Sequence, residues 1–523
     1  MKIVSSEAMA EIDRRSQAEF AFPSTVLMED TGLKAWGIMK REISPAERTR
    51  GTTATAGGAQ VGGAAGRLVF VAGGGNNGGD ALVMARRAAV EGGRAVTVIL
   101  AGARPSPGSD PGRMLAMCEA LGLECLPWPG EPAGARLAEA GWIVDGLAGT
   151  GLRGSLRAPL AGLVTTMNAA AGRRIALDVP SGVGDGFREG NPAVRAEITL
   201  TMGLPKACLY LPRARAFCGR IVVVHVGFPP ALLESAEIVG ELLTRSSWRE
   251  RLLPVPADTH KNLRGHLAVF AGASGTTGAA WLCASAAARC RVGLVTVFAD
   301  AQAYPVLAPK LTSVMCRPWD GSPVPAGWNP EGFSAVLAGP GWGTADEKER
   351  FLESVLSFPR GGVIDADGLA LLKRILDRSG TSLGGRWVLT PHPGEFSRLT
   401  GLAKDEVLDD PVGHALSLSS RVGAVVVLKG HSTIVAAPDG RYWVLDGANP
   451  ALATGGAGDV LAGIIAAGCA TGLGALDAAL FGVSLHSHVA RVAARRVGWF
   501  LAEDLVPLLS TVLKPAVYGG GPT

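Results

Sequence analysis

Several features that would point to a particular class of protein are missing from this chain of 523 residues. Its formal net charge is only +4, which gives no reason to expect nucleic acid as a partner. The first residues, MKIVSSEAMAEIDRR, contain acids and no apolar segment, so we expect no secretion signal. The uncharged run from Val460 to Leu476 is interrupted by Gly and Ala residues. We expect a core helix there and no membrane span.

The eight cysteines include no C-x-x-C pair of the kind found in metal and redox sites. Cys118 and Cys125 are seven residues apart, as are Cys283 and Cys290, a spacing that predicts one helix face for each pair. We therefore expect buried, reduced thiols and a cytoplasmic protein.

Glycine, by contrast, is abundant: the chain has 72, about twice the usual share of roughly 7%. The glycines are spread through many strand-to-helix turns. Continuous apolar strands alternate with helices in two successive series, which predicts parallel sheets covered on both faces. No period of about 20 to 50 residues repeats, so we expect two α/β domains, at residues 1–235 and 245–523, rather than a solenoid.

The stretch RLVFVAGGGNNGGDALVMARRA joins an apolar strand to a helix through a glycine-rich turn. Gly73, Gly75 and Gly78 fit the G-x-G-x-x-G fingerprint of dinucleotide-binding proteins. The acid that holds a ribose hydroxyl about twenty residues later is missing, because the next strand, AVTVILAG, ends in ARPSPG. The turn therefore predicts an anionic ligand, but not NAD as a resident cofactor.

Three more loops at strand ends carry unusual residues: VDGLAGTGLRGS, LDVPSG and MGLPK. Glycine loops at helix N-termini expose backbone N–H groups that suit phosphate. Asn77, Asp145 and Ser181 supply oxygen ligands with one formal charge, which favours a monovalent cation over Mg²⁺. Asp178, at a strand end, can act as an acid or a base.

With the lead-in MAEIDRRSQAEFAFPSTVLMEDTG, these loops make residues 1 to about 230 resemble the NAD(P)H-hydrate epimerase (YjeF N-terminal) family, which implies a Rossmann-like αβα sandwich. Two departures are visible, Ala81 after NNGGD and SGVGDG after Pro180, and neither removes a ligating group. The resemblance implies K⁺ at Asn77, Asp145 and Ser181. It implies substrate contacts at Asn76, Asn77, Gly78, Gly79, Asp80, Gly149, Thr150, Gly151, Leu152, Arg153, Gly154, Ser155 and Asp178.

The second series contains GGAGD followed by a long apolar helix. This motif puts backbone N–H groups around a developing phosphate charge, with Asp459 in reach of an attacking hydroxyl. No Walker pattern is present. The arrangement resembles ribokinase-like kinases, in which an acid is the base and a glycine turn is the anion hole.

The motifs TPHPGE, HKNLRGH and GASGTTGAA make residues 245 to 520 resemble the NAD(P)H-hydrate dehydratase (YjeF C-terminal) family, which has a ribokinase-like αβα fold. The resemblance implies hydrate contacts at Ala279, Gly341, His392 and Asp459, with Asp459 catalytic. It implies nucleotide contacts at Lys429, Gly430, His431, Ser432, Thr433 and Gly458.

The two resemblances together imply a repair enzyme for hydrated NADH and NADPH. One half interconverts the R and S hydrates, with Asp178 moving a proton. The other half spends ADP or ATP, with Mg²⁺, to eliminate the hydroxyl of the S form. We expect no nucleic acid, no membrane and a homo-oligomer. Two alternatives stay open: a ribokinase-like small-molecule kinase, and a non-catalytic N-terminal scaffold like that of mRNA-decapping proteins.

Overall fold

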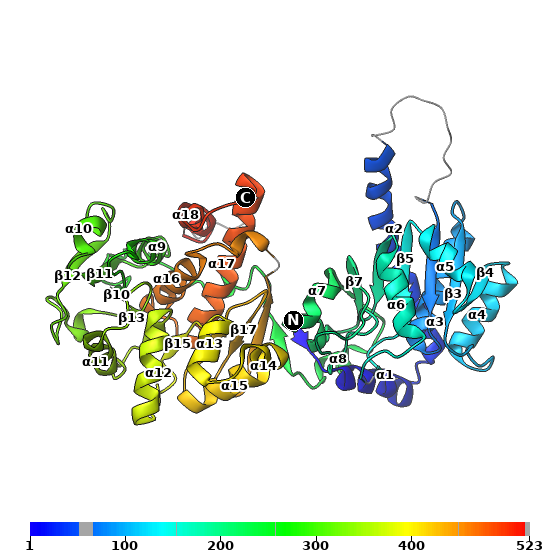
Figure 1. Ribbon diagram of the computed structural model, residues 1–523, viewed down its shortest axis with the longest axis horizontal. Helices are drawn as coiled ribbons and strands as arrows, with labels where there is room; N and C mark the ends of the chain where they lie inside the picture. Colours follow the sequence, from blue (N-terminus) through cyan, green and yellow to red (C-terminus); the bar gives the residue numbers. More distant parts are fainter. Residues whose placement is uncertain (52–65, 153, 257, 448, 518–523) are drawn as a thin grey trace. The chain divides into compact units, whose positions relative to one another are not determined.

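The computed structural model describes residues 1–51, 66–152, 154–256, 258–447 and 449–517. The chain forms two compact units, Lys2–Gly240 and Glu241–Thr523. The domains expected from the sequence were residues 1–235 and 245–523. Each unit is built around its own β-sheet (Figure 1).

The N-terminal unit contains a seven-stranded sheet in the order β4-β3-β2-β5-β6-β7-β8, in which every neighbouring pair is parallel. The strands are β2 (Leu68–Ala72), β3 (Val96–Ala101), β4 (Glu124–Trp128), β5 (Trp142–Gly146), β6 (Arg173–Leu177), β7 (Ile198–Met202) and β8 (Arg220–Val224), and a short β1 (Lys2–Ile3) precedes them.

Helices cover both faces of this sheet, as the continuous apolar strands predict. Phe70 faces a core shared with α2, α3 and α4, whereas Val69 and Val71 face one shared with α5 and α6. The helices are α1 (Ser6–Phe20), α2 (Ser24–Gly51), α3 (Asn76–Glu91), α4 (Asp110–Ala120), α5 (Glu131–Ala138), α6 (Leu160–Ala169), α7 (Pro212–Cys218) and α8 (Pro230–Glu234).

The strand order reverses between β2 and β5. The chain leaves β2 for β3 on one side and returns to β5 on the other, where Leu68 pairs with both Val96 and Trp142. Because adjacent connections diverge at such a point, a crevice opens beyond the carboxyl ends of the two strands. The GGGNNGGD turn lies there, between β2 and α3.

The C-terminal unit contains a larger sheet with the order β9-β18-β17-β16-β15-β14-β13-β10-β11-β12. Its strands are β9 (Gly240–Leu242), β10 (His266–Phe270), β11 (Leu294–Asp300), β12 (Met315–Trp319), β13 (Ala335–Ala338), β14 (Gly362–Ile364), β15 (Trp387–Leu389), β16 (Val425–Leu428), β17 (Ser432–Ala436) and β18 (Tyr442–Asp446). In the part of this sheet that contains β16, β15, β14, β13, β10, β11 and β12, every neighbouring pair is parallel. The strand β17 is antiparallel to both of its neighbours, β16 and β18.

Two groups of helices sandwich this sheet (Figure 1). One face packs against α9 (Thr277–Ala288), α16 (Ala457–Ala470) and α17 (Ala475–Val497), with α18 (Ala502–Val517) outside them. The other helices are α10 (Tyr304–Leu307), α11 (Asp346–Val355), α12 (Asp367–Ser379), α13 (Pro393–Thr400), α14 (Lys404–Asp409) and α15 (Pro411–Val422). The uncharged run from Val460 to Leu476 forms most of α16 and the first residues of α17. Most residues of α16 are buried in the core.

The predicted fold class, two α/β domains with parallel sheets, is confirmed. The predicted shared helix face of the cysteine pairs is wrong: Cys125 lies in β4, a strand that the sequence reading missed, and Cys290 follows the end of α9. All eight cysteines are free thiols, and six of them are buried.

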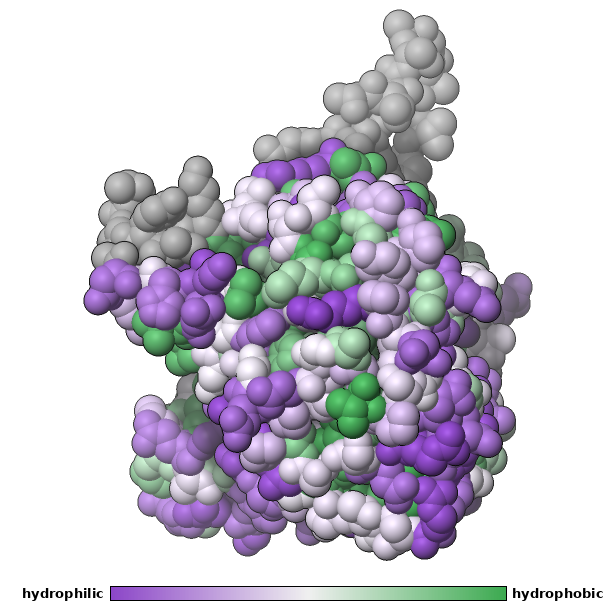
Figure 2. Space-filling model, turned by 90° about the vertical axis from the view of Figure 1, so that its left-hand side faces the viewer, coloured by the Kyte–Doolittle hydropathy of each residue, from purple (hydrophilic) through white to green (hydrophobic). Residues whose placement is uncertain are grey.

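Among the residues that the structure describes, no helix combines the length and the apolar character needed to cross a membrane. On the face shown in Figure 2, hydrophobic residues lie in small patches among hydrophilic ones.

Candidate functional sites

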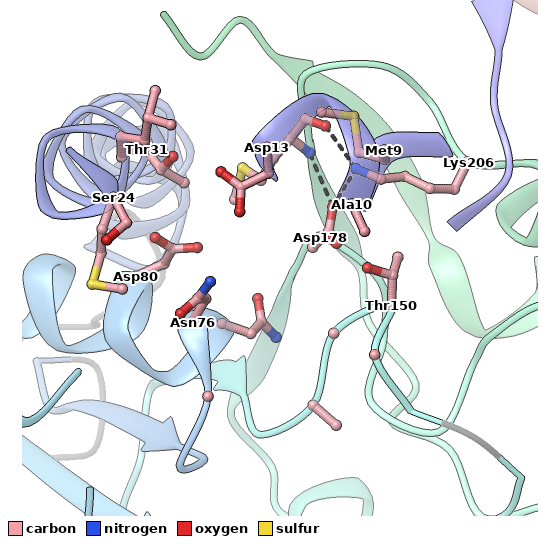
Figure 3. A pocket seen from close by; sticks show the side chains of 18 of the residues that line it. Met9, Ala10, Asp13, Ser24, Thr31, Asn76, Asp80, Thr150, Asp178 and Lys206 are labelled. Atoms are coloured by element: carbon pink, nitrogen blue, oxygen red, sulfur yellow. Dashed lines mark hydrogen bonds and ion pairs between the residues drawn. The ribbon is translucent and has the colours of Figure 1, made fainter. Parts of the chain in front are cut away.

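A cavity of about 540 Å³ opens in the N-terminal unit, beyond the carboxyl ends of β2, β5, β6 and β7. The glycine turn, the loop after β5, Asp178 after β6 and the loop after β7 line it together with residues of α1 and α2 (Figure 3). All four loops singled out from the sequence thus meet at one site, as parallel strands require.

The glycine turn combines residues that line the cavity with residues that only pack. Gly75, Asn76, Asn77 and Asp80 line the cavity. Gly78 is buried, and a Cβ at this position would lie 1.9 Å from the carbonyl oxygen of Gly73. Because no side chain fits there, Gly78 lets α3 approach β2 closely, and its backbone N–H can still face an anion at the helix N-terminus.

The loop after β5 provides Gly149, Thr150, Gly151 and Leu152 to the cavity lining. Gly154 and Ser155 lie further along the loop and are absent from that lining. Arg153, the remaining predicted contact of this loop, lies outside the described residues.

Asp178 follows β6 with φ of 62°, a left-handed conformation that non-glycine residues adopt mainly where function or packing imposes it. Its Oδ1 accepts a hydrogen bond from Nζ of Lys206 (2.5 Å) and one from the backbone N–H of Met202 (3.3 Å). Lys206 is fully buried and was not assigned a role from the sequence, although the MGLPK loop was singled out.

Two further carboxyl groups face the same cavity, and both have raised pKa values. Burial raises the pKa of Asp80 well above 3.8, and the charges of Asp178 and Asp13 raise it further. Burial also raises the pKa of Asp13, against a hydrogen bond with Gln17 that lowers it. Asp13 lies in α1, and its role was not recognised from the sequence.

Asp145, Ser181 and Asn77, the residues predicted to hold a cation, lie around the same edge of the sheet. Asp145 is fully buried, and its oxygens accept hydrogen bonds from Oγ (2.5 Å) and N (2.8 Å) of Ser181 and from N of Leu147 (3.2 Å). Burial raises the pKa of Asp145 to about 6. Both polar side-chain atoms of Asn77 are buried without a hydrogen-bond partner in the described structure. An unpartnered amide oxygen near a buried carboxylate fits a weakly charged cation.

In the C-terminal unit, Asp459 lies in the first turn of α16, after the GGAG turn. Burial, together with the charges of Asp365 and Glu395, raises the pKa of Asp459 to about 7, although Lys429 opposes this rise. A carboxyl group with a pKa near neutrality suits a general base, because it is ionised at working pH yet still basic.

A network of charges surrounds Asp459. Nζ of Lys429 lies 2.9 Å from Oδ1 of Asp365 and 3.6 Å from Oε2 of Glu395. A Cβ at Gly458 would lie 3.4 Å from the same Nζ, which places Lys429 beside the GAGD turn. Lys429 and Gly458, both predicted nucleotide contacts, are therefore neighbours. Asp365 and Glu395 were not recognised from the sequence, although Glu395 lies in the TPHPGE motif.

His392 caps α13. Its Nδ1 accepts hydrogen bonds from the backbone N–H groups of Gly394 (3.0 Å) and Glu395 (3.3 Å), and Oε2 of Glu395 accepts one from the backbone N–H of His392. Burial lowers the pKa of His392. Since Nδ1 is an acceptor, the neutral ring carries its proton on Nε2, which can donate to a ligand.

The remaining predicted contacts divide between two places. Ala279 and Gly341 lie together, because a Cβ at Gly341 would be 3.0 Å from that of Ala279, and the φ of 53° at Gly341 suits glycine. In the segment after Lys429, Ser432 is buried in β17 and Thr433 donates to the carbonyl of Gly430 (3.4 Å). Gly430 and the exposed His431 connect Lys429 to β17.

Comparison with known proteins matches both halves of the chain. A family model described as "YjeF-related protein N-terminus" matches residues 24–208, and one described as "NAD(P)H-hydrate dehydratase" matches residues 267–510. The chain is 37% identical over 439 residues to the bifunctional NAD(P)H-hydrate repair enzyme Nnr of Coxiella burnetii, covering 82% of this chain and 86% of that protein. It is 32% identical over 537 residues to the enzyme of the same name from Moorella thermoacetica, covering 98% and 97%.

Among solved structures, the ADP/ATP-dependent NAD(P)H-hydrate dehydratase of Bacillus subtilis, co-crystallised with ATP and Mg²⁺, is 27% identical with a TM-score of 0.47. The match covers 53% of this chain and 99% of that chain.

Proposed function

The chain belongs to the family of bifunctional NAD(P)H-hydrate repair enzymes, and we propose that its two units act in series on hydrated NADH and NADPH. The N-terminal unit interconverts the R and S hydrates. The C-terminal unit eliminates the hydroxyl of the S hydrate with ADP or ATP, releasing AMP or ADP and phosphate. The observation that carries this proposal is the pair of complete acid-containing sites, one at the carboxyl edge of each sheet.

In the dehydratase site, Asp459 takes the proton from the substrate hydroxyl as its oxygen attacks the terminal phosphate of the nucleotide. The N–H groups at the start of α16, including that of Gly458, stabilise the charge that develops on the transferred phosphate. The phosphorylated hydroxyl then leaves as phosphate, and loss of a proton from the adjacent ring carbon forms the double bond that restores the reduced ring. Lys429, beside Gly458, is placed to contact the nucleotide phosphates.

Mg²⁺ is expected to enter this site with the nucleotide. Within the described residues, no cluster of three His, Cys, Asp or Glu side chains can hold a metal ion. Mg²⁺ commonly binds through one or two carboxylates together with substrate phosphates, and Asp365 and Glu395 lie near Lys429 to provide them.

In the epimerase site, we propose that Asn77, Asp145 and Ser181 hold K⁺, on the evidence of the unpartnered Asn77 amide and the buried carboxylate of Asp145. K⁺ there would neutralise charge next to the phosphates of the substrate. Asn76, Asp80 and the loop after β5 line the cavity that receives the hydrate, and Asp178 moves a proton at the altered ring.

The eight free cysteines support a reducing compartment, in keeping with a cytoplasmic enzyme. A homo-oligomer stays a prediction, which light scattering of the purified protein can check.

The test is to incubate a mixture of R and S hydrates with the protein, Mg²⁺ and ADP or ATP, and to follow absorbance at the dihydronicotinamide band. We expect complete recovery, because the epimerase feeds the dehydratase. Recovery that stops at the S fraction would refute the epimerase assignment. A phosphorylated product that accumulates without recovery of absorbance would instead identify a small-molecule kinase.

A further inference from the structure

The epimerase cavity holds two carboxyl groups in opposite electrostatic surroundings. Asp178 follows β6 and contacts Lys206, whereas Asp80 lies in α3 (Figure 3). The carboxyl group of Asp13 reaches the cavity from α1, between the two (Figure 3). The sequence provided a reason to assign proton transfer to Asp178 alone.

Lys206 fixes the orientation of the carboxyl group of Asp178. Its Nζ donates to Oδ1 of Asp178, to the carbonyl of Met202 (2.6 Å) and to Oγ1 of Thr201 (3.3 Å), so all three of its N–H donors are used. A buried ammonium is stable only when it is paired in this way. Both contacts that the structure describes for the Asp178 side chain go to Oδ1, which leaves Oδ2 toward the cavity.

Asp80 has the opposite environment. Within the described residues it forms no salt bridge, and Arg86, a basic residue on the same helix, pairs with Glu29 of α2. Burial, Asp178 and Asp13 together raise the pKa of Asp80 well above 3.8, which favours its protonated form. The cavity therefore presents one carboxyl group paired with a buried cation and one without a described salt bridge, whose raised pKa favours its protonated form.

An epimerase for these hydrates needs such an asymmetric pair. Water adds to an enamine at the carbon bonded to nitrogen, so the hydroxyl-bearing carbon of the hydrate is also bonded to the ring nitrogen. Inverting that carbon requires one of its bonds to break and to form again on the other face. A base and an acid acting together lower the barrier to both events.

We propose that Asp80 is the proton donor of the epimerase, that Asp178 is the proton acceptor, and that Lys206 is a positioning residue that orients Asp178. This assignment rests on the proposed epimerase function and adds Asp80 and Lys206 to its machinery.

The step conserves atoms and charge. Asp178 removes the hydroxyl proton, the oxygen forms a carbonyl with the ring carbon, and the carbon–nitrogen bond breaks with its electron pair going to nitrogen, which takes the proton of Asp80. After the carbonyl rotates, the nitrogen attacks its other face. The proton on nitrogen returns to Asp80, and the oxygen takes the proton back from Asp178. Both side chains are restored, so one site serves both directions.

The first experiment compares Asp80→Asn with Glu91→Gln, the same carboxyl-to-amide change at the far end of α3, where Glu91 pairs with Lys40 on the surface. Each isolated hydrate isomer is given to the full chain, and interconversion and dehydration are measured separately. We expect Asp80→Asn to lower kcat for epimerisation about 10²- to 10⁴-fold, the usual effect of losing a general acid. Dehydration by the same chain and both activities of Glu91→Gln should stay normal.

The second experiment addresses Lys206. Lys206→Met should lower kcat for epimerisation, measured per active site, with little change in KM, because Asp178 loses the contact that orients its carboxyl group. Lys206→Arg should recover part of the rate. A purely structural role would reduce the amount of active protein and leave kcat per active site unchanged, which would overturn the assignment of Lys206.

The third experiment uses hydrate labelled with ¹⁸O in its hydroxyl group. Ring opening retains the label through each inversion, whereas loss and re-addition of water exchanges it. Exchange at every inversion, or a normal epimerisation rate in Asp80→Asn, would overturn the proposal. Absence of interconversion by the unmodified chain would instead refute the epimerase function itself, so the two failures are distinguishable.

Discussion

Replacing Asp459 by asparagine should abolish dehydration and at the same time stabilise the C-terminal unit. The structure raises the pKa of Asp459 from 3.8 to about 7, chiefly by burial and by the neighbouring Asp365. The folded protein therefore resists ionisation of the group that catalysis needs in ionised form. One pKa unit corresponds to about 1.36 kcal/mol, so the rise of roughly three units sets an upper limit of about 4 kcal/mol on the gain in unfolding free energy at pH 8.

The sign follows from proton binding. Between about pH 4 and pH 7 the folded state binds more protons at Asp459 than the unfolded state, so the unmodified protein loses stability as the pH rises through this window. Asparagine has no such dependence. The difference in unfolding free energy should be near zero below about pH 4, grow up to about pH 7 and stay constant above it.

The assay is urea unfolding at pH 5 and pH 8, with hydrogen exchange of α16 reporting on the C-terminal unit, alongside recovery of dihydronicotinamide absorbance. We expect dehydration to fall about 10²- to 10⁴-fold while nucleotide binding and epimerisation persist. Asp477→Asn is the matched control, because Asp477 lies in the first turn of α17 but is exposed and pairs with Arg251. A less stable Asp459→Asn protein, a pH-independent difference or near-normal dehydration would refute the reasoning.

Three further variants test the N-terminal unit. Asp178→Asn should stop epimerisation while dehydration of the S hydrate continues, and equal damage to both half-reactions would contradict this. Asp145→Ala should weaken epimerisation and remove its dependence on K⁺. This prediction fails if replacing K⁺ by a bulky organic cation slows the Asp145→Ala variant as much as it slows the unmodified protein. Gly78→Ala should lower the stability of the unit by about 1 to 3 kcal/mol, because the new Cβ would meet the carbonyl oxygen of Gly73 at 1.9 Å. Gly134→Ala, a helical position with open space around it, should be neutral or stabilising by up to about 1 kcal/mol, and similar thermal shifts for both would contradict the steric argument.

The strand pattern was sufficient to predict the architecture and the edge at which ligands bind. Runs such as RLVFVAG and HLAVFAG are apolar throughout because both of their faces are buried, and parallel strands must bring their carboxyl ends to one edge. Two parts of the sheets were not recognised. The strand β4, with the sequence ECLPW, is short and only partly buried, and the antiparallel β17–β18 pair has a register that depends on its neighbours.

The sequence by itself determined which loops meet at each site, because strand order along the chain and right-handed connections restrict where a strand can end. Only the tertiary structure decided which charges meet. Lys206 contacts Asp178 across 28 residues of chain, and Lys429 contacts Asp365 across 64. The protonation state of a carboxyl group depends on its burial and on charges within a few ångströms. That is why the pKa of Asp80 rises while Asp178 pairs with Lys206, although both are plain aspartates in the sequence.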